Sequence, residues 1–519
     1  MTKQSHIIAV LCFACSALSA QVDREGEPLS WNFTQQIPTE AIWNAQPFLD
    51  ILTITAEDAL VETDKATPFR FAKTNDVNYN LENSGRWTNL ANGDRIWMLG
   101  IECADAYSVG ITFSDLELPR GANVFIYSEN HQEYIGPLTE NDNRVDQLVC
   151  MPPVFDDKII LEYYEPYAFR GEGRIEISSV AQGYRNLRDE SLVAQLNCMQ
   201  PLQSSELQVT GLNASSSVLM MIVDNGQRIA TGTMVNNSSN NAIPYVLTAS
   251  SALVGESSSW LFLFDVAGSN CMQSGSVCLS KAVCGAYVVD ENEEHGITLL
   301  RLRSYPRSTW SAYYSGFSID KSKQSEDHHC LQNAFGLPQS IATFNGVCAD
   351  DVWNGLAVSG IDGWQAGQTF KGAVGSPIFD EAFSLIGIYL GGGSSCSSNS
   401  SEYFASLHSV WEDFKQYLDP HDLVTDELAG FYPIIPSANQ PTFDNAIFIF
   451  PNPANSWIYV QNKSENPLLR IEAFDASGKL VTTWSPIVPT IDTSSLIEGV
   501  YHLHFIFEDK SLVQKLLVY

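Results

Sequence analysis

Short apolar segments separated by turn signals run through almost the whole sequence, and this pattern constrains the fold more than any other feature. Within residues 21–190 such segments occupy 95–100, 109–113, 124–127 and 159–164. Turn signals such as Asn92-Gly93 and Asp156-Asp157 separate them, as is typical of strands joined by tight connections. No long stretch of this region has the 3.6-residue period of an amphipathic helix. The pattern predicts a β-sandwich over residues 21–190.

Residues 191–420 again read mainly as strands, at 218–223, 231–235, 245–248, 260–264, 297–302 and 385–389. One helix is predicted, over 407–418, because Leu407, Val410, Trp411, Phe414 and Leu418 fall on one face. The pair Asp419-Pro420 ends that helix. The region is therefore expected to be a second β-rich domain with one terminal helix.

The C-terminal part of the chain divides into a linker and a third β-rich domain. Residues 421–443 hold several acidic residues and three prolines, which suits a linker. Residues 444–519 contain apolar or alternating runs at 447–450, 457–460, 468–474, 501–507 and 513–518. Five or more strands in so short a segment predict a small immunoglobulin-like sandwich. The fold class expected for the whole chain is all-β.

Charge and hydropathy restrict the partners. The chain has 28 Lys and Arg against 60 Asp and Glu, a net charge of −32, which excludes a nucleic-acid surface built on positive charge. Residues 1–20 combine Lys3, an apolar core and small residues before a cut after Ala20, so they are expected to be a secretory signal peptide. The rest of the chain has no apolar run of about 18 residues, so no transmembrane segment is predicted.

The sequence offers no convincing metal or cofactor site. Removing residues 1–20 takes away two of the 11 cysteines, and the remaining nine contain no Cys-x-x-Cys pair. His328-His329, with Asp327 and Cys330 beside them, are expected to lie in a surface loop rather than to bind a metal. His295, near Glu293 and Glu294, is expected to be a solvated loop histidine. We therefore predict neither a metal nor a cofactor.

Four motifs follow one another in the last domain: PNPA at 451–454, FDASGKL at 474–480, GVY at 499–501 and KLLV at 515–518. With these motifs the domain resembles the C-terminal sorting domain of proteins exported by the type IX secretion system of Bacteroidetes. The resemblance implies that residues 444–519 engage the type IX secretion machinery. It also implies export across the outer membrane, removal of the domain, and attachment to the cell surface or release.

The middle domain contains an ordered set of motifs: GTMVNN at 232–237, PYVLTA at 244–249, ITLLRL at 297–302, GSPIFD at 375–380 and GGGSSC at 391–396. With this set it resembles the trypsin-like serine proteases, in particular their secreted bacterial lysyl-endopeptidase branch. The resemblance implies a chymotrypsin-like double β-barrel over residues 191–420. Residues 85–185 likewise resemble the propeptide region of such proteases, so residues 21–190 are expected to be a propeptide-like domain.

The catalytic positions that the resemblance implies do not carry the family's chemistry. Ser251 stands where the family has its His base, Gly296 where it has the orienting Asp, and Val374 where it has the Ser nucleophile. The place of the lysine-selecting acid falls on Ser401, with Glu402 next to it as an alternative. Gly372 and Gly375 remain, so the amides of Gly372 and Val374 are candidates for an anion-binding nest, although a purely conformational role is favoured.

These observations favour a secreted cell-surface pseudoprotease that acts in protein binding or scaffolding, with an unidentified protein or peptide partner. Two alternatives remain open. One is an adhesin or a structural subunit of an outer-membrane surface complex. The other is an active serine endopeptidase with relocated catalytic residues.

The resemblance also implies disulfides and processing. It pairs Cys198 with Cys396. We further expect Cys103–Cys150 to close the sandwich and Cys330–Cys348 to clasp a hairpin. Since Ala252 lacks the family's thiol, one cysteine among Cys271, Cys278 and Cys284 is expected to be unpaired. An inactive protease cannot cut its own junction between residues 185 and 197, so the propeptide-like domain is expected to stay attached.

Overall fold

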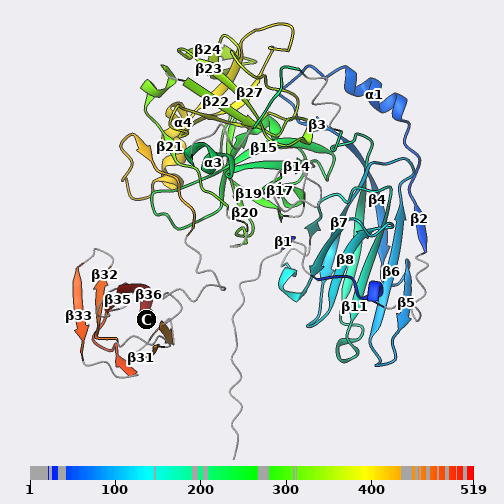
Figure 1. Ribbon diagram of the computed structural model, residues 1–519, viewed down its shortest axis with the longest axis horizontal. Coiled ribbons are helices and arrows are strands. Elements are labelled where there is room, and N and C mark those ends of the chain that lie inside the picture. The colour runs from blue at the N-terminus through cyan, green and yellow to red at the C-terminus, as the bar shows by residue number, and fades with distance from the viewer. Residues whose placement is uncertain are drawn as a thin grey trace, which may run out of the picture. The chain divides into compact units, whose positions relative to one another are not determined.

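The computed structural model shows a predominantly β-stranded chain in two compact units, Met1–Pro433 and Ile434–Tyr519 (Figure 1). It describes residues 21–22, 26–32, 42–144, 148–189, 197–202, 209–266, 279, 281–307, 310, 312–325, 327–433, 447–450, 454, 457–462, 468–475, 479–485, 490–497, 499–506 and 511–518. The predicted signal peptide lies outside these residues. The all-β class predicted from the strand pattern is confirmed.

The N-terminal part of the first unit is the predicted sandwich of two sheets. One sheet has the strand order β10-β7-β12-β4, and the other has the order β2-β6-β11-β8-β9 with β5 beside β6. Alternate side chains of both sheets, among them Trp97, Phe113 and Tyr163, are fully buried between them. The strands are β2 (Trp43–Ala45), β4 (Ala72–Asn80), β5 (Arg86–Asn89), β6 (Arg95–Glu102), β7 (Ser108–Glu117), β8 (Asn123–Ser128), β9 (Tyr134–Leu138), β10 (Val149–Cys150), β11 (Lys158–Glu165) and β12 (Arg174–Gly183).

A helix, α1 (Ile51–Ala59), precedes the sandwich strands and was not expected from the sequence. Asp50 caps it, because its side chain accepts hydrogen bonds from the Thr53 amide at 3.1 Å and the Thr53 hydroxyl at 2.7 Å. Only Ile54 and Asp58 of this helix are buried, while Leu52 is 84% exposed. The helix therefore has no apolar stripe that a periodicity argument would detect.

The rest of the first unit contains two strongly curled sheets, the arrangement of a double β-barrel. The first has the order β1-β18-β17-β14-β15-β16-β20-β19, with β3 on β15, and the second has the order β13-β23-β22-β26-β27-β28-β25-β24, with β21 on β27 and β29 on β21. The first sheet uses β1 (Gln21–Val22), β3 (Phe69–Arg70), β14 (Val218–Val223), β15 (Arg228–Val235), β16 (Tyr245–Ala249), β17 (Leu261–Leu263), β18 (Ala282–Cys284), β19 (Ala286–Asn292) and β20 (Ile297–Leu302). The second uses β13 (Gln200–Pro201), β21 (Phe317–Ser318), β22 (Asp327–Gln332), β23 (Ser340–Asn345), β24 (Ala349–Trp353), β25 (Leu356–Ile361), β26 (Pro377–Phe379), β27 (Leu385–Gly392), β28 (Glu402–Ser406) and β29 (Glu427–Leu428).

The helices of this part are α3 (Val209–Ser215) and α4 (Leu407–Leu418). The predicted terminal helix is confirmed with its bounds, and its five apolar side chains are all buried. Residues 421–433, which we assigned to the linker, instead pack on the barrel. Asp419 accepts hydrogen bonds from the Leu423 and Val424 amides, β29 pairs with β21, and Phe431 pairs with Tyr314. These backbone pairings correct that part of the linker prediction.

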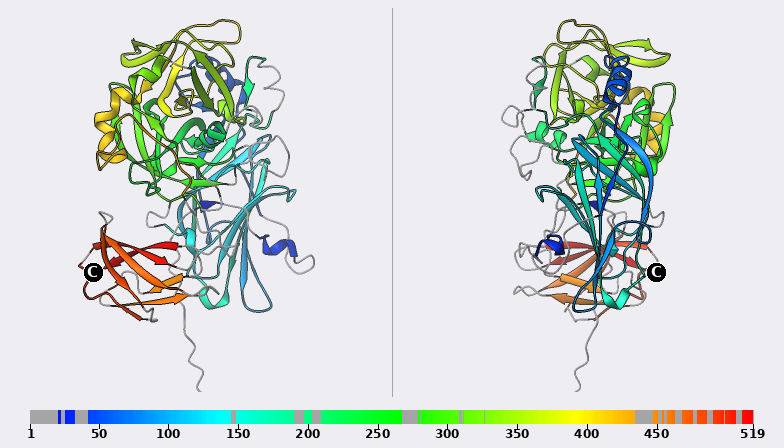
Figure 2. Two further views of the ribbon diagram at one scale, coloured as in Figure 1. Left: turned by 60° about the vertical axis from the view of Figure 1, so that its left-hand side comes forward. Right: turned by 90° about the vertical axis from the view of Figure 1, so that its right-hand side faces the viewer.

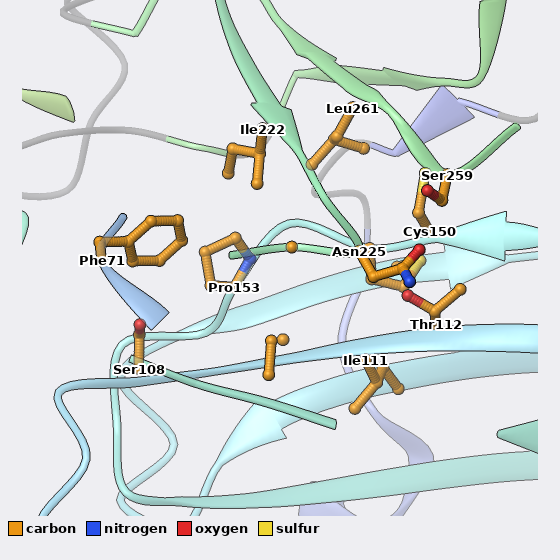
Figure 3. A pocket seen from close by; sticks show the side chains of 14 residues that line it. Phe71, Ser108, Ile111, Thr112, Cys150, Pro153, Ile222, Asn225, Ser259 and Leu261 are labelled. Carbon is orange, nitrogen blue, oxygen red and sulfur yellow. The ribbon is translucent and has the colours of Figure 1, made fainter. Parts of the chain in front are cut away.

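The sandwich and the double barrel share one apolar core. Ile222 and Leu261, on the outward face of the first barrel sheet, belong to the same buried cluster as Ile111 of the sandwich. Figure 3 shows this contact, where the cavity beside Ile111, Ile222 and Leu261 is about 20 Å³, close to one water molecule. The two parts also adjoin in both views of Figure 2. The shared buried cluster shows that the sandwich packs against the barrel.

The disulfides agree with the predictions in part. The Cys198–Cys396 bond is confirmed. The predicted Cys103–Cys150 bond is wrong, because Cys150 lies at the sandwich–barrel contact and is bonded to Cys284, while Cys103 is buried and free. Cys271 and Cys278 lie outside the described residues.

The predicted Cys330–Cys348 bond is also wrong, since both thiols are free. Strand register explains it: Cys330 of β22 faces Ala342 of β23, whereas the Cys348 sulfur lies 3.6 Å from Nε2 of His328. The expected surface loop around His328 and His329 is instead the strand β22, in which His328 is only 1% exposed.

The second unit is the predicted small sandwich. Its sheets have the orders β30-β31-β34 and β33-β32-β35-β36, and Ile458, Ile471, Leu503 and Leu516 lie in its core. The strands are β30 (Ile447–Phe450), β31 (Trp457–Asn462), β32 (Arg470–Asp475), β33 (Leu480–Trp484), β34 (Thr490–Asp492), β35 (Gly499–Ile506) and β36 (Ser511–Val518). In the part of the chain that the structure describes, no helix has the length and apolar character needed to cross a membrane.

Candidate functional site

The positions predicted for the base and its orienting acid lie side by side. Ser251 occupies a 3₁₀ turn, Ser250–Ala252, directly after β16, and Gly296 directly precedes β20. Strands β16 and β20 are antiparallel neighbours with Ala249 opposite Ile297. The amide of Ser250 donates to the carbonyl oxygen of Gly296 at 2.9 Å. The strand pairing therefore brings these two positions together.

The position predicted for the nucleophile, Val374, lies near these two positions but belongs to the second sheet. Val374 lies on the loop before β26, and its carbonyl accepts a hydrogen bond from the Thr231 amide of β15 at 3.0 Å. At the next residue, Gly375, a Cβ atom would lie 2.2 Å from the hydroxyl oxygen of Thr248. The loop thus passes the end of β16, where Ser251 follows. The Val374 side chain is fully buried.

The turn before Gly296 is covered by the hairpin strand β25. Gly296 has φ of +67°, and a Cβ atom there would lie 2.8 Å from Cδ1 of Leu356. The amide of Ala357 donates to the Glu294 carbonyl at 2.9 Å. Nδ1 of His295 lies 3.0 Å from the side-chain oxygen of Asn292 in the same turn. A left-handed backbone and a near side chain therefore both favour glycine at position 296.

The backbone conformation explains why glycine stands on both sides of Val374. Gly372 and Gly375 have φ of +93° and +87°, and a Cβ at Gly375 would also lie 2.1 Å from the Thr231 carbonyl oxygen. The Gly372 carbonyl accepts from the Thr231 hydroxyl at 3.0 Å. Residues 371–380 are buried throughout. Backbone conformation and close packing therefore explain both glycines, and no anion-binding role is needed to explain them.

A buried polar site, called the pocket below, is formed beside this loop by Thr369, Tyr389, Ser394 and Glu402. Glu402, the first residue of β28, is 1% exposed and accepts hydrogen bonds from four groups. The donors are the Ser394 amide at 2.7 Å, the Thr369 hydroxyl at 3.0 Å, the Tyr389 hydroxyl, and the Lys65 ammonium at 2.8 Å. Gly392 makes room for it, because a Cβ at that position would lie 2.5 Å from Cδ of Glu402. Glu402, rather than Ser401, is thus the acidic residue of this pocket.

The cation in the pocket comes from a segment more than 300 residues earlier in the chain. Lys65 is 7% exposed, and its ammonium also donates to the Thr369 hydroxyl at 3.1 Å. Burial lowers the pKa of Lys65, and the charge of Glu402 opposes that shift. Burial beside Glu402 raises the pKa of Tyr389, which keeps its hydroxyl proton available as a donor. The pocket is therefore a matched acceptor for one primary ammonium group.

A second buried lysine holds the backbone of the same segment. The ammonium of Lys371 donates to the carbonyls of Val61 and Asp64, at 2.8 and 2.6 Å, and to the hydroxyl of Thr67 at 2.6 Å. Lys371 is 4% exposed, and burial lowers its pKa while the charge of Asp64 opposes the shift. The segment 61–67 is thus bound through both a side chain and its backbone.

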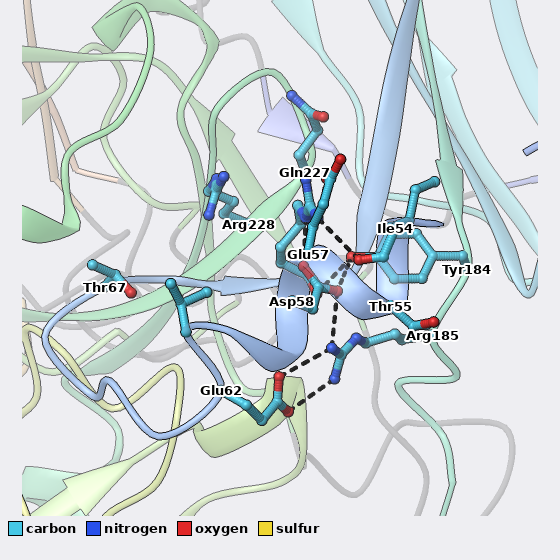
Figure 4. Close-up of polar contacts among 12 residues, drawn as sticks. Ile54, Thr55, Glu57, Asp58, Glu62, Thr67, Tyr184, Arg185, Gln227 and Arg228 are labelled. Carbon is cyan, nitrogen blue, oxygen red and sulfur yellow. Dashed lines mark hydrogen bonds and ion pairs between the residues drawn. The ribbon is translucent and has the colours of Figure 1, made fainter. Parts of the chain in front are cut away.

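Helix α1 fixes the start of that segment through a carboxylate network (Figure 4). Asp58 accepts hydrogen bonds from Nε of Arg70 at 2.7 Å, from Arg185 at 2.9 Å and from the Tyr184 hydroxyl at 2.5 Å. Arg185 also pairs with Glu62 at 3.1 Å. Burial would raise the pKa of Asp58, but the hydrogen bonds from Tyr184, Arg185 and Arg70 outweigh it and lower the pKa below 3.8.

Sequence reasoning anticipated only part of this site. It singled out the loop around Val374 and offered Glu402 as an alternative to Ser401, but it did not single out Lys65, Thr369 or Tyr389. The glycine run 391–393 was the usable signal, because Gly392 leaves space for Glu402. Across the described ranges, no cluster of three His, Cys, Asp or Glu residues has the arrangement of a metal site.

Comparisons with known proteins assign two parts of the chain. Residues 194–405 match the family model described as lysyl endopeptidase, C-terminal domain, and residues 448–519 match the one described as secretion system C-terminal sorting domain. The chain therefore combines a protease-like fold with a secretion-sorting tail. The tail indicates secretion to the cell surface or the extracellular space.

Solved structures that resemble the chain include proteases. An inactive form of Rv3671c from M. tuberculosis H37Rv is 12% identical, with 44% of this chain and 98% of that chain covered, at a TM-score of 0.30. The MamO protease domain from Magnetospirillum magneticum is 11% identical, with 39% and 97% covered, at a TM-score of 0.28. The HtrA-type protease AlgW with a tripeptide is 10% identical, with 59% and 95% covered, at a TM-score of 0.30.

Proposed function

We propose that this protein is a secreted pseudoprotease, whose protease-like double barrel binds a protein or peptide partner without cleaving it. The observation that carries the proposal is the set of residues at the three catalytic positions. A Ser251 hydroxyl does not accept a proton at neutral pH, Gly296 has no side chain to orient a base, and Val374 has no nucleophilic atom.

The surroundings of Gly296 also support the proposal that the protein is a pseudoprotease. The backbone at position 296 is left-handed, with φ of +67°, a conformation that glycine adopts without strain. The Cβ of an aspartate there would press on Cδ1 of Leu356, 2.8 Å away. The turn therefore favours glycine, and an aspartate would displace the Leu356 side chain.

The retained pocket supports a binding role. Glu402 is 1% exposed and accepts hydrogen bonds from four donors, one of which is the ammonium group of Lys65. Burying such a charge is costly unless it is fully paired, so the pocket is built for a cationic side chain. We propose that lysine-bearing segments are the ligands of this pocket.

Export follows from the second unit. We propose that residues 444–519 engage the type IX secretion machinery and deliver residues 21–433 to the cell surface or the medium. The family match of residues 448–519 and the motifs within them support this assignment.

The experiment is covalent labelling of the purified protein with a fluorophosphonate probe, followed by mass spectrometry of every serine peptide. A trypsin-like protease labelled in parallel serves as the positive control. We expect no labelled serine in this protein, and none in its Val374→Ser variant, because no base would accept the hydroxyl proton. Stoichiometric labelling of one serine, abolished by replacing that serine with alanine, would show an active site with relocated residues.

A further inference from the structure

Lysine side chains of soluble proteins are rarely buried, so the position of Lys65 calls for an explanation. In the turn around it, Thr63 and Asp64 are exposed, yet Lys65 points into the barrel and is 7% exposed. Its ammonium lies 2.8 Å from Glu402 and 3.1 Å from the Thr369 hydroxyl. We propose that residues 61–69 are a tethered ligand that occupies the lysine pocket in cis, so that a lysine-bearing segment of another protein binds only after this segment has left.

The barrel also contacts the backbone of the segment. A Cβ atom at Gly391 of β27 would lie 2.5 Å from the Trp353 ring, and 3.2 Å and 3.3 Å from the Cβ and Cα of Ala66. Lys371 donates to two carbonyls and one hydroxyl of the segment. A side chain at residue 391, or the loss of the Lys371 ammonium, would therefore disturb the bound backbone.

The end of the segment continues as an added strand. Phe69 and Arg70 form β3, which pairs antiparallel with β15 through Phe69 opposite Ile229. The Phe69 ring packs edge-on against Phe335 at 5.2 Å, next to Gly372. Strand β3 pairs with the end of β15 at Arg228 and Ile229, where the neighbouring strand β16 does not reach. Addition of a strand to free backbone groups of a sheet, with side chains in pockets, is a common mode of peptide binding. The segment is thus held by a buried side chain and by strand pairing, as a bound peptide would be.

The rest of the first unit keeps this ligand in place. The Asp58 network anchors α1 and β3 next to the segment, and the Cys150–Cys284 bond ties the sandwich to the barrel. A tethered ligand competes at an effective concentration on the order of millimolar, which a dilute external ligand does not overcome. The pocket is therefore closed to other lysines while the segment remains bound. This inference rests on the pocket and holds whether or not the barrel cleaves peptides.

The test opens the pocket by charge reversal. In Lys65→Glu a second carboxylate would face Glu402 in a buried site, so the segment should leave. Lys73→Glu makes the same charge change at an exposed position of β4 and is the matched control. The probe is a fluorescein-labelled peptide of residues 60–71 (LVETDKATPFRF) added to the full-length proteins, with binding followed by fluorescence anisotropy.

We expect the peptide to bind Lys65→Glu at least tenfold more tightly than the wild-type protein or Lys73→Glu. Acetylating the peptide's lysine should weaken this binding at least tenfold, because the charge that pairs with Glu402 is lost. Equal binding to the wild-type protein and to Lys65→Glu, whether tight or absent, would overturn the proposal.

A second measurement needs no substitution and applies even if Lys65→Glu fails to fold. The native wild-type protein is treated with an amine-acetylating reagent, and the modification of each lysine is followed by mass spectrometry. We expect Lys65 and Lys371 to react at least tenfold more slowly than Lys73. Reaction of Lys65 at the rate of Lys73 would show that the pocket is open, and would contradict the proposal.

Discussion

At the residue scale, the pocket depends on one carboxylate whose acceptor sites are all in use. An ionised carboxylate offers about four acceptor sites, and Glu402 meets four donors. The pair with Lys65 is therefore fully hydrogen-bonded as well as buried. Under these conditions removal of one partner is far more damaging than replacement of both by apolar groups.

Replacing Glu402 by Gln should test this coupling. The Lys65 ammonium would remain buried opposite a neutral amide, so we expect Glu402→Gln to destabilise the first unit by about 3–5 kcal/mol. In the double variant Lys65→Met/Glu402→Gln most of this loss should be regained. Thermal unfolding of the full chain, followed by tryptophan fluorescence, compares the wild-type protein, both single variants and the double variant. If the losses of Lys65→Met and Glu402→Gln simply add up in the double variant, the two residues are not coupled.

Asp58 makes the anchor of the segment sensitive to acid. Its folded-state pKa lies below its ordinary value of 3.8, so ionised Asp58 stabilises the folded chain above about pH 4. That contribution is lost as the pH falls through the folded-state pKa. We expect Asp58→Asn to be less stable than the wild-type protein at pH 7 and the difference to shrink below pH 4. A stability difference that is constant from pH 7 to pH 3 would show that the Asp58 charge does not contribute.

At the element scale, the parts that follow from local periodicity were predictable. The strand runs and α4 follow from alternating or 3.6-period apolar residues that face one core. Helix α1 could not be predicted from periodicity, because it buries only Ile54 and Asp58. The pocket could not be predicted for another reason. No local pattern marks Lys65 as a ligand of Glu402, which lies 337 residues away in the sequence.

The two disulfide predictions were wrong for a similar reason. They rested on the spacing of cysteines along the chain, which does not report contacts between distant residues. Cys150 faces the barrel, and only the packing of β10 against β18 shows that its partner is Cys284. Likewise, the register of β22 and β23 places Ala342, not Cys348, opposite Cys330. Pairings between separate sheets are fixed by tertiary packing, which spacing in the sequence does not encode.

These pairings can be checked by alkylation of the native protein. Burial raises the pKa of Cys103 and Cys348 to about 12, so at pH 8 only about one thiol in ten thousand is ionised. We expect Cys103, Cys330 and Cys348 to resist iodoacetamide in the folded protein and to react after denaturation. Peptide mapping should recover Cys150–Cys284 and Cys198–Cys396. A peptide that links Cys103 to Cys150 would contradict this arrangement.

At the scale of the whole molecule, the Cys150–Cys284 bond determines what a cut between the two parts of the first unit would do. If an added protease cleaves the junction between residues 185 and 197, the N-terminal fragment should remain attached to the barrel. On a gel the cleaved protein should therefore run as one species without reductant and as two with it. Cys103→Ser should behave in the same way, because that thiol is free, whereas Cys150→Ser should release two fragments without reductant under denaturing conditions.

Export depends on the second unit. Deleting residues 444–519 should leave the protein in the periplasm, because the sorting motifs and the family match lie there. Cell fractionation and surface labelling compare the deletion with the full chain in a strain with an intact type IX system. Delivery of the truncated protein to the surface would remove the basis for the export assignment.

The central claim, that the cleft binds lysine without cleaving beside it, is tested most directly by opening the cleft. A wild-type protein would also be inert if it were an active protease closed by its own segment, so the decisive sample is Lys65→Glu. This variant is incubated with the peptide of residues 60–71, and binding and hydrolysis are followed in the same sample by anisotropy and mass spectrometry. We predict a bound peptide that stays intact over many hours. Cleavage after the peptide's lysine that copurifies with the variant and is abolished by a single serine replacement within it would contradict the account.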